Sequence, residues 1–284
     1  MARASLITNV SDTARWVAAY RAVESARPDA LFHDPYAGKL AGDHGHAIAK
    51  DATRVMGSGW PIIARTKIMD DLVKKAVSEG CDRILNLAAG LDTRPYRLDL
   101  PADLAWVEAD LPAMIEEKNA FFASEKPRCA LSREKVDLSD GAARAAFLDR
   151  ATRDAKKVLV ITEGLLIYLE EPVVASLARE LAARPTVAWW MFDLASPGAK
   201  NVLETRVRLD NAPLYFAPAN GVAYFEARGW RALDVEPVVE HARSMKRLPL
   251  FLRLVAALSP TPDPRNLRRA TWLGVVRLEA TNEK

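Results

Sequence analysis

The chain has 284 residues, half of them apolar and 27% charged, which is the composition of an ordered globular protein. Its formal net charge of +3 is too small to indicate a nucleic-acid partner, because such proteins carry a clustered basic face. Its two cysteines exclude a disulfide framework and a multi-cysteine zinc site. No apolar stretch is long enough to span a membrane, and we expect a cytoplasmic protein without a nucleic-acid, membrane or metal partner.

The first part of the chain is expected to be helical. A helix is predicted over 12–26 from apolar side chains at helical spacing. These side chains are Trp16, Ala19, Tyr20 and Val23. Asp34 precedes a proline and is interpreted as the structural N-cap of another helix. Residues 42–61 are rich in glycine and are expected to form an irregular connection, followed by a helix over 62–79 with Arg65 near its start.

From residue 83 onward, apolar segments alternate with helical patterns. Strands are predicted near 83–89, 105–109, 131–136, 158–162, 187–193, 231–236 and 273–279. Helices are predicted near 112–124, 139–152, 171–184, 221–229 and 239–257. This alternation is typical of an α/β protein with a doubly wound, mostly parallel seven-stranded sheet. In such sheets a ligand binds beyond the carboxyl ends of the strands.

One segment, residues 83–110, has the form of a half-site for an adenosine cofactor. Its first predicted strand ends at Gly90, where the absence of a Cβ lets a ligand approach the backbone. Its second ends at Asp110, about 20 residues later, the spacing of a ribose-binding carboxylate. The phosphate-binding glycine pattern of dinucleotide enzymes is absent, which favours a phosphate-free cofactor such as S-adenosylmethionine. An ordinary strand and turn is the alternative interpretation.

Two further strand ends carry acidic residues. Asp137 and Leu138 follow the third predicted strand, where a carboxylate and an apolar side chain suit an adenine ring. Asp137 is equally well interpreted as a helix N-cap. Glu163 lies in the very apolar sequence VLVITEGLLIYL, where a charged group is costly unless it is paired. A role for Glu163 in ligand binding follows from that cost.

Together these pieces resemble the leucine carboxyl methyltransferase family of S-adenosylmethionine-dependent enzymes. The matching motifs are HDPYA at 33–37, ARTKIMDD at 64–71, LAAGLDTRPYRL at 87–98, VEADLP at 107–112, VDL at 136–138 and EGLLIYL at 163–169. They occur in the order found in the family. The six motifs together are specific for this family, whereas no single one of them would be.

The resemblance implies a Rossmann-like class I methyltransferase fold and S-adenosyl-L-methionine as the cofactor. The cofactor-binding residues that it implies are Arg65, Gly90, Asp110, Asp137, Leu138 and Glu163. In this assignment Arg65 binds the methionine carboxylate, Asp110 the ribose and Glu163 the methionine amino group. The pair at 137–138 frames the adenine. Tyr168 is implied as the catalytic residue, at the junction between cofactor and acceptor.

The chain departs from the family at one point, since Ala88 stands where the family usually has a glycine. Four other matching residues are expected to fix the loop internally rather than to act in catalysis. They are Asp92, Thr93, Arg94 and Arg97. Arg21 is a looser match that would add a contact in the pocket.

A single domain is expected. It would comprise an N-terminal helical cap over 1–61, a cofactor-binding core over 62–195, a lid insertion over 196–220 and the C-terminal part of the sheet over 221–284. The lid is inferred from prolines and a glycine that interrupt the alternation of strands and helices. The oligomeric state stays open.

The leading interpretation is an O-methyltransferase that methylates a carboxylate of a small molecule or peptide by in-line displacement. A carboxylate is anionic at neutral pH and needs no general base, whereas a phenol or alcohol, the close alternative, would profit from one. His241 is the one histidine worth testing as a base, and His44 and His46 are interpreted as a surface pair. Alternatives of another class are a nicotinamide-dependent oxidoreductase and a non-catalytic binding protein.

Overall fold

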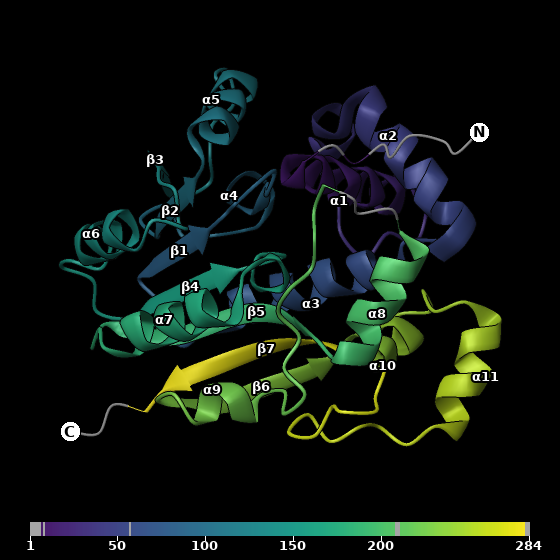
Figure 1. Ribbon diagram of the computed structural model, residues 1–284. Helices are drawn as coiled ribbons and strands as arrows, with labels where there is room; N and C mark the ends of the chain where they lie inside the picture. Colours follow the sequence, from purple (N-terminus) through teal and green to yellow (C-terminus); the bar gives the residue numbers. More distant parts are fainter. Residues whose placement is uncertain (1–6, 8, 57, 208–210, 282–284) are drawn as a thin grey trace.

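A computed structural model describes residues 7, 9–56, 58–207 and 211–281 (Figure 1). The sequence-based limits of the N-terminal cap, the lid insertion and the C-terminal part include residues outside these ranges. All seven predicted strands are confirmed, and they form one sheet. The strands are β1 (Arg83–Leu87), β2 (Ala105–Asp110), β3 (Ala130–Lys135), β4 (Val158–Thr162), β5 (Val187–Ala195), β6 (Trp230–Pro237) and β7 (Leu273–Ala280).

The sheet has the order β3-β2-β1-β4-β5-β7-β6. β1 to β5 pair in parallel, whereas β7 runs antiparallel to both of its neighbours, β5 and β6. The mostly parallel sheet is therefore confirmed. The register pairs Leu87 with Ala109 and Glu108 with Arg133, so β1, β2 and β3 end at the same edge of the sheet.

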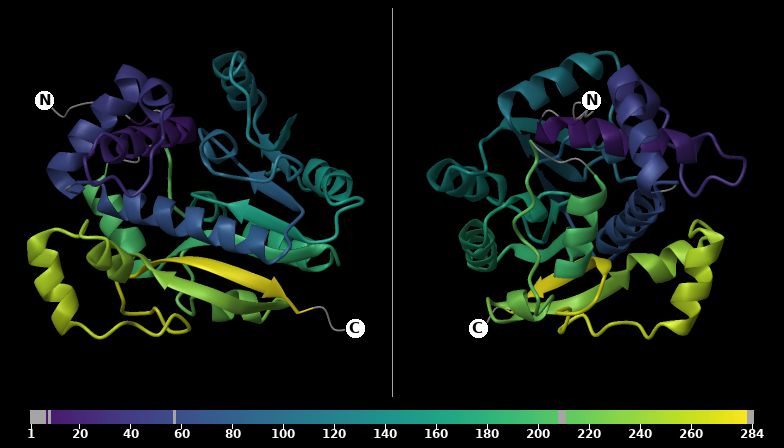
Figure 2. Two further views of the ribbon diagram at one scale, coloured as in Figure 1. Left: turned by 180° about the vertical axis from the view of Figure 1, so that it is seen from behind. Right: turned by 45° about the vertical axis from the view of Figure 1, so that its right-hand side comes forward.

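Helices cover both faces of the sheet (Figures 1 and 2). They are α1 (Val10–Ser25), α2 (Ala37–Met56), α3 (Trp60–Ser78), α4 (Arg94–Arg97), α5 (Pro112–Phe121), α6 (Gly141–Ala151), α7 (Glu171–Ala182), α8 (Pro197–Arg206), α9 (Ala223–Glu226), α10 (Val238–Ser244), α11 (Leu250–Leu258) and the 3-10 helix η1 (Leu166–Tyr168). Successive side chains of a strand point to opposite faces. In β4, Val160 accordingly packs in the cluster with Phe147 of α6, and Leu159 packs in the cluster with Met69 of α3.

The two N-terminal helices pack on each other and on the loop after β1. The predicted irregular connection at 42–61 is wrong, because α2 continues to Met56 with a break only at Gly42. Gly45 is required by packing, since a Cβ there would lie 2.6 Å from the carbonyl oxygen of Arg15 in α1. Ile48 and other apolar side chains of α2 then form a buried face toward α1. Close helix packing, rather than a loop, requires glycine here.

The single helix predicted over 239–257 is also wrong, because it forms two helices, α10 and α11. Lys246 has a positive φ of 59°, which ends the α-helical path. Pro249 is the N-cap of α11, and a proline that lacks an N–H cannot continue α10. Among the described residues, no helix has both the length and the apolarity that crossing a bilayer requires.

The segment between β5 and β6 begins with α8, whose N-cap Ser196 accepts a hydrogen bond from the backbone of Ala199. Farther along, the backbone N–H groups of Tyr215 and Phe216 donate to the carbonyl of Ile167 in η1. Leu214 is buried in the same apolar cluster as α1 and α2. This segment therefore lies between η1 and the N-terminal helices, while its function as a lid stays a prediction.

A buried ion pair connects the turn before α11 to α1. The guanidinium of Arg247 donates from NH2 to Oε1 of Glu24 at 2.8 Å and from Nε to Oε2 at 2.9 Å. Glu24 has no exposed surface and Arg247 is 8% exposed. Residues more than two hundred positions apart in the sequence are thereby held together.

Candidate functional site

The carboxyl ends of β1 to β4 and one side of α1 surround a cavity of about 490 Å³, a volume typical of small-ligand sites. All seven residues singled out from the sequence line it. They are Arg65, Gly90, Asp110, Asp137, Leu138, Glu163 and Tyr168. α1 contributes Ser11, Thr13, Ala14 and Val17 to the lining. The fold thus brings these residues together, while their individual roles stay predictions.

The turn after β1 and the end of β2 are held to each other. Gly90 has a positive φ of 46°, and its backbone N–H donates to Oδ2 of Asp110 at 2.7 Å. The other carboxylate oxygen of Asp110 accepts from the N–H of Leu111 at 2.7 Å. Burial raises the pKa of Asp110, against these two hydrogen bonds that favour its ionised form.

Glu108, the other acid of β2, has a different environment. It is completely buried and forms ion pairs with Lys118 and Arg133, each at 2.7 Å. It does not line the cavity, whereas Asp110 does. Asp110, the last residue of β2, therefore faces the cavity, whereas Glu108 is enclosed by its ion-pair partners.

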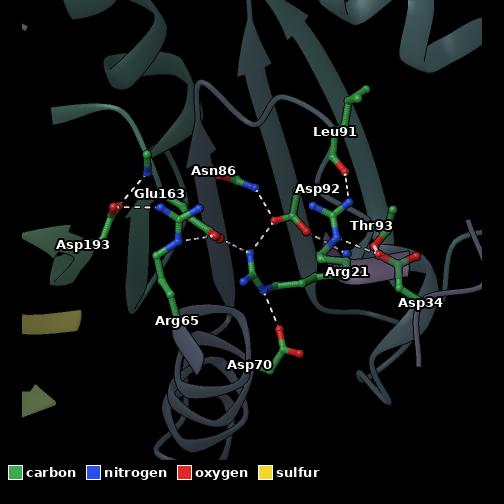
Figure 3. A network of polar contacts seen from close by, with 12 residues as sticks. Arg21, Asp34, Arg65, Asp70, Asn86, Leu91, Asp92, Thr93, Glu163 and Asp193 are labelled. Atoms are coloured by element: carbon green, nitrogen blue, oxygen red, sulfur yellow. Dashed lines mark hydrogen bonds and ion pairs between the residues drawn. The ribbon is translucent and has the colours of Figure 1, made fainter. Parts of the chain in front are cut away.

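Arg65, which comes from α3, lies between two carboxylates (Figure 3). Its NH1 donates to Oδ2 of Asp193 at 2.9 Å, and its Nε forms an ion pair with Oε1 of Glu163 at 3.0 Å without hydrogen-bond geometry. The second oxygen of Asp193 accepts from the N–H of Gly164 at 2.6 Å. Among the described residues, Asp193 is the only hydrogen-bond acceptor of this guanidinium, so most of its five N–H donors are without an acceptor.

Asp193 did not emerge from the sequence. It lies in the middle of the apolar strand WWMFDLA, the same signal by which Glu163 was recognised. It fixes both the guanidinium of Arg65 and the backbone that follows Glu163. Asp193 therefore acts on the site by orienting its neighbours.

Glu163 lies between two arginines. Its Oε2 accepts from Arg94 at 2.8 Å, on the side opposite Arg65. Burial alone would raise the pKa of Glu163, but the charges of Arg94 and Arg65 hold it below its usual range. Arg94 is 2% exposed and also pairs with Asp70 and Asp92. The carboxylate of Glu163 is thus kept ionised at the cavity wall.

The loop that follows β1 is fixed by internal hydrogen bonds, as the sequence predicted. Oδ2 of Asp92 accepts from the amide of Asn86 and from Arg94, both at 2.8 Å. Asp70 accepts from both Arg94 and Arg97. These contacts confirm that the loop is fixed internally, while Asp92, Arg94 and Arg97 also line the cavity.

Asp34 has the structural role predicted for it. Its Oδ1 accepts from the backbone N–H groups of Tyr36 and Ala37 at the start of α2, both at 3.1 Å. Its Oδ2 accepts from Arg21 of α1 at 2.8 Å and from the hydroxyl of Thr93 at 2.6 Å. Figure 3 shows how this group joins α1 to the loop after β1.

Asp137 and Leu138 lie at the rim of the cavity, just after β3. Asp137 is exposed, and its Oδ1 accepts from the backbone N–H and the hydroxyl of Ser139. The alternative interpretation of Asp137 as a helix N-cap is wrong, because Asp140 caps α6. Leu138 is half-buried against the apolar cluster of the sheet. One polar and one apolar side chain are therefore presented side by side.

Tyr168 comes from η1 and lines the cavity next to the first turn of α1. Burial raises the pKa of its hydroxyl, although a hydrogen bond with Thr13 and the charge of Arg65 act in the other direction. The hydroxyl is therefore protonated at neutral pH and available as a hydrogen-bonding group. The contact with Thr13 joins η1 to the first turn of α1.

Thr66 is a second residue that sequence reasoning missed. Its side chain is 1% exposed and lines the cavity, yet its hydroxyl has no hydrogen-bond partner among the described residues. A buried hydroxyl without a partner is unfavourable, so Thr66 is a polar group of the cavity wall whose hydrogen bonding is unsatisfied.

The histidines lie away from this cavity. His44 and His46 are exposed, and Nε2 of His44 is 3.2 Å from Oδ1 of Asp12. Nε2 of His241 is 2.6 Å from Oε2 of Glu236. Across the ranges that the structure describes, no three His, Cys, Asp or Glu residues are grouped as a metal site would require.

Solved structures with a similar fold are methyltransferase-like. A crystal structure of a protein described as a methyltransferase from Thermobifida fusca has a TM-score of 0.61 at 16% identity, covering 97% of this chain and 96% of that one. A protein of the DUF574 family from Streptomyces avermitilis has a TM-score of 0.54 at 13% identity, covering 93% and 96%. At these identities the likeness shows the fold.

Sequence comparisons are more specific. The family model for leucine carboxyl methyltransferase matches residues 14–182. A protein of Mycolicibacterium smegmatis named as an S-adenosyl-L-methionine-dependent methyltransferase is 33% identical over 262 residues, covering 83% of this chain and 87% of the relative. One with a similar name from Streptomyces avermitilis is 32% identical over 255 residues, covering 83% and 87%. The chain is therefore an S-adenosylmethionine-dependent methyltransferase and belongs to the leucine carboxyl methyltransferase family.

Proposed function

We propose that this enzyme methylates a carboxylate of a small molecule or peptide by in-line displacement. The observation that carries the proposal is the chemistry of the cavity wall. None of the described residues that line it is a histidine, cysteine or lysine. Burial opposes ionisation of Asp92, but its arginine and lysine neighbours hold its pKa below the usual range. The pKa of Glu163 is likewise held below its usual range, by Arg94 and Arg65. The cavity thus favours an acceptor that is already anionic at neutral pH.

A phenol or alcohol would lose a proton in the reaction and would profit from a base with a pKa near neutrality. Asp110 has a raised pKa, but its two oxygens accept the backbone N–H groups of Gly90 and Leu111. Tyr168 has a raised pKa and is a donor rather than a base at neutral pH. These properties support the carboxylate acceptor over the hydroxyl acceptor.

S-adenosylmethionine supplies, when bound, a methyl group on a positively charged sulfur. In the proposed arrangement Arg65 would bind the cofactor's carboxylate through its free donors, and Glu163 would accept from its amino group. Asp110 would accept from the ribose hydroxyls. Asp137 would accept from the adenine amine, with Leu138 against the ring.

Gly90 would allow close backbone approach, and Tyr168 would contact the acceptor at the point of transfer. The protein's contribution to the displacement is alignment and the exclusion of water. The buried cavity wall and the fixed loop after β1 support this role of the protein, since few side chains of the site would have to move when the cofactor binds.

The test is a screen of small acids, peptides, phenols and alcohols with methyl-labelled cofactor. A carboxylate acceptor gives a methyl ester, so mild alkali should release the label as methanol. Because a carboxylate has a pKa of about 4, we expect kcat/KM to be nearly constant from about pH 6 to 8. Thermal stabilisation by S-adenosylhomocysteine checks separately that the enzyme binds its cofactor.

A label that resists alkali, together with a kcat/KM that rises with pH, would show a methyl ether and overturn the carboxylate assignment. Phenols, with a pKa of about 10, should give that rise.

A further inference from the structure

α11 presents an unusual apolar face to solvent. The exposed fractions are 73% for Leu250, 66% for Phe251, 65% for Leu254, 57% for Val255 and 88% for Leu258. Their spacing places them along one side of the helix. A concentration of large apolar side chains on one surface is typical of an interaction site.

The other side of α11 holds it to the protein. Leu252 and Ala256 pack against the apolar cluster that contains α10, and Nε of Arg253 donates to the carbonyl of Leu248 at 2.8 Å. Figures 1 and 2 show α11 at the periphery of the molecule, joined to it by loops. The outer face therefore takes no part in the packing of the residues that the structure describes.

The segment that contains α11 is basic, although Glu240 of α10 accepts a hydrogen bond from Thr261 in the loop after it. From residue 243 to 262 the sequence has four cationic residues and no Asp or Glu. Arg243 and Lys246 are exposed just before α11, and neither side chain has an ion-pair partner in the described part of the chain. Arg253 lies within the helix itself. Arg247 is neutralised by Glu24 and Asp29, so the charge that accompanies the apolar face is that of Arg243, Lys246 and Arg253.

We propose that α11 binds the surface of an anionic lipid bilayer. An apolar face that enters the headgroup region beside basic residues is the arrangement of helices that lie in the plane of a membrane. The expectation that this protein has no membrane partner was based on the lack of a spanning stretch, and a helix lying on the surface needs none.

A second copy of the chain fits this face less well. Pairing α11 with itself would bring Arg243, Lys246 and Arg253 of one copy toward those of the other, and like charges oppose association. The helix has nine residues and is about 13 Å long, which is short for a contact of about 800 Å² per partner. An anionic surface complements the charge that a second copy would repel.

The test is sedimentation of the full-length protein with vesicles of phosphatidylcholine alone or of phosphatidylcholine and phosphatidylglycerol in equal amounts. We expect binding to the anionic vesicles that weakens with salt. The double variant Phe251→Ser with Leu254→Ser should bind at least about tenfold less. Arg243→Glu with Lys246→Glu should reduce binding about 30-fold or more on anionic vesicles.

The matched control is Val23→Ser, which removes an apolar side chain of 52% exposure on α1 and should leave vesicle binding unchanged. Stabilisation by S-adenosylhomocysteine should be equal in all variants, since α11 does not line the cavity, and it verifies folding. The proposal is overturned if no vesicle is bound, if the α11 variants bind as well as the wild type, or if those variants instead abolish a dimer.

Discussion

Ala88 adopts a backbone conformation that its side chain disfavours. It has a φ of 52° at the turn after β1, two residues before Gly90. The left-handed conformation costs an L-residue with a Cβ about 1 to 2 kcal/mol. The chain therefore retains local strain in the wall of its own cofactor cavity.

Replacing Ala88 with glycine should accordingly raise the free energy of unfolding by up to about 1 kcal/mol. Relief of the left-handed strain exceeds the entropic cost of glycine, which is about 0.4 to 1 kcal/mol. Denaturant unfolding of the ligand-free protein measures the difference. Ala89→Gly is the control, because Ala89 is buried without a positive φ, and this change should lower stability. Equal changes in the free energy of unfolding for Ala88→Gly and Ala89→Gly would contradict the conclusion that the backbone of Ala88 is strained.

Asp110 is the residue whose proposed contact with the cofactor is easiest to isolate. Asp110→Ala should weaken binding of S-adenosylhomocysteine by about 1.5 to 3 kcal/mol through lost ribose hydrogen bonds, measured by calorimetry. Asp110→Asn, which keeps an acceptor for the N–H of Gly90, should lose less. Asp71→Ala removes an exposed carboxylate of α3 and should have no effect. A folded Asp110→Ala variant with full affinity would refute the role.

At the scale of single residues, the sequence revealed the site where a charge was conspicuous against its surroundings. Glu163 and Asp110 were recognised because each follows or interrupts an apolar strand. Thr66 could not be found in this way, since a threonine in a helix gives no local signal, and its unpaired hydroxyl is a property of the packing. Asp193 had the same signal as Glu163 but only the fold places it beside Arg65.

Among the elements, α2 shows how a glycine can indicate a contact rather than a loop. Gly45→Ala would place a Cβ 2.6 Å from the carbonyl oxygen of Arg15, so it should lower the free energy of unfolding by about 1 to 3 kcal/mol through overpacking. Gly38→Ala in the same helix meets only the Cβ of Ala22 at 3.8 Å and should be neutral or slightly stabilising. Thermal unfolding of both variants checks this. Similar losses in the two would show that helix contact is not the cause.

The central strands were predictable because buried parallel strands are short, continuous apolar runs. β4, for example, is buried at every residue. Helix boundaries were less predictable, since they depend on tertiary contacts and on backbone conformations that composition does not reveal. The break at Lys246, a residue type that usually continues a helix, is one such case.

For the whole molecule, the buried carboxylates make stability depend on acid pH. Burial alone would raise the pKa values of Asp34, Asp92 and Glu163, but neighbouring arginines hold them lower in the folded protein than in the unfolded chain. Their stabilising contribution is present above about pH 4.5 and is lost as pH falls through the folded-state values. Burial raises the pKa of Asp110 in the folded protein, so the effect of this residue on stability is opposite: its ionisation destabilises the folded state as pH rises.

Tm should therefore fall steeply as pH is lowered from about 5 to 3, measured by calorimetry in buffers of constant ionic strength. Asp92→Asn should reduce the slope, because it removes one carboxylate whose pKa differs between the folded and unfolded states. A Tm that is constant over this interval would contradict the prediction that the buried ion pairs of these carboxylates stabilise the folded protein.

The ion pair between Arg247 and Glu24 has a consequence for dissecting the protein. The region shared with the family model, residues 14–182, contains Glu24 but not its partner. A fragment cut to that length would lose the guanidinium that pairs with this carboxylate, together with the turn that carries it. It would also turn β4 into an unpaired apolar edge that invites aggregation. The stretch that identifies the protein is thus not a unit that can fold by itself, and a minimal enzyme must extend through β7.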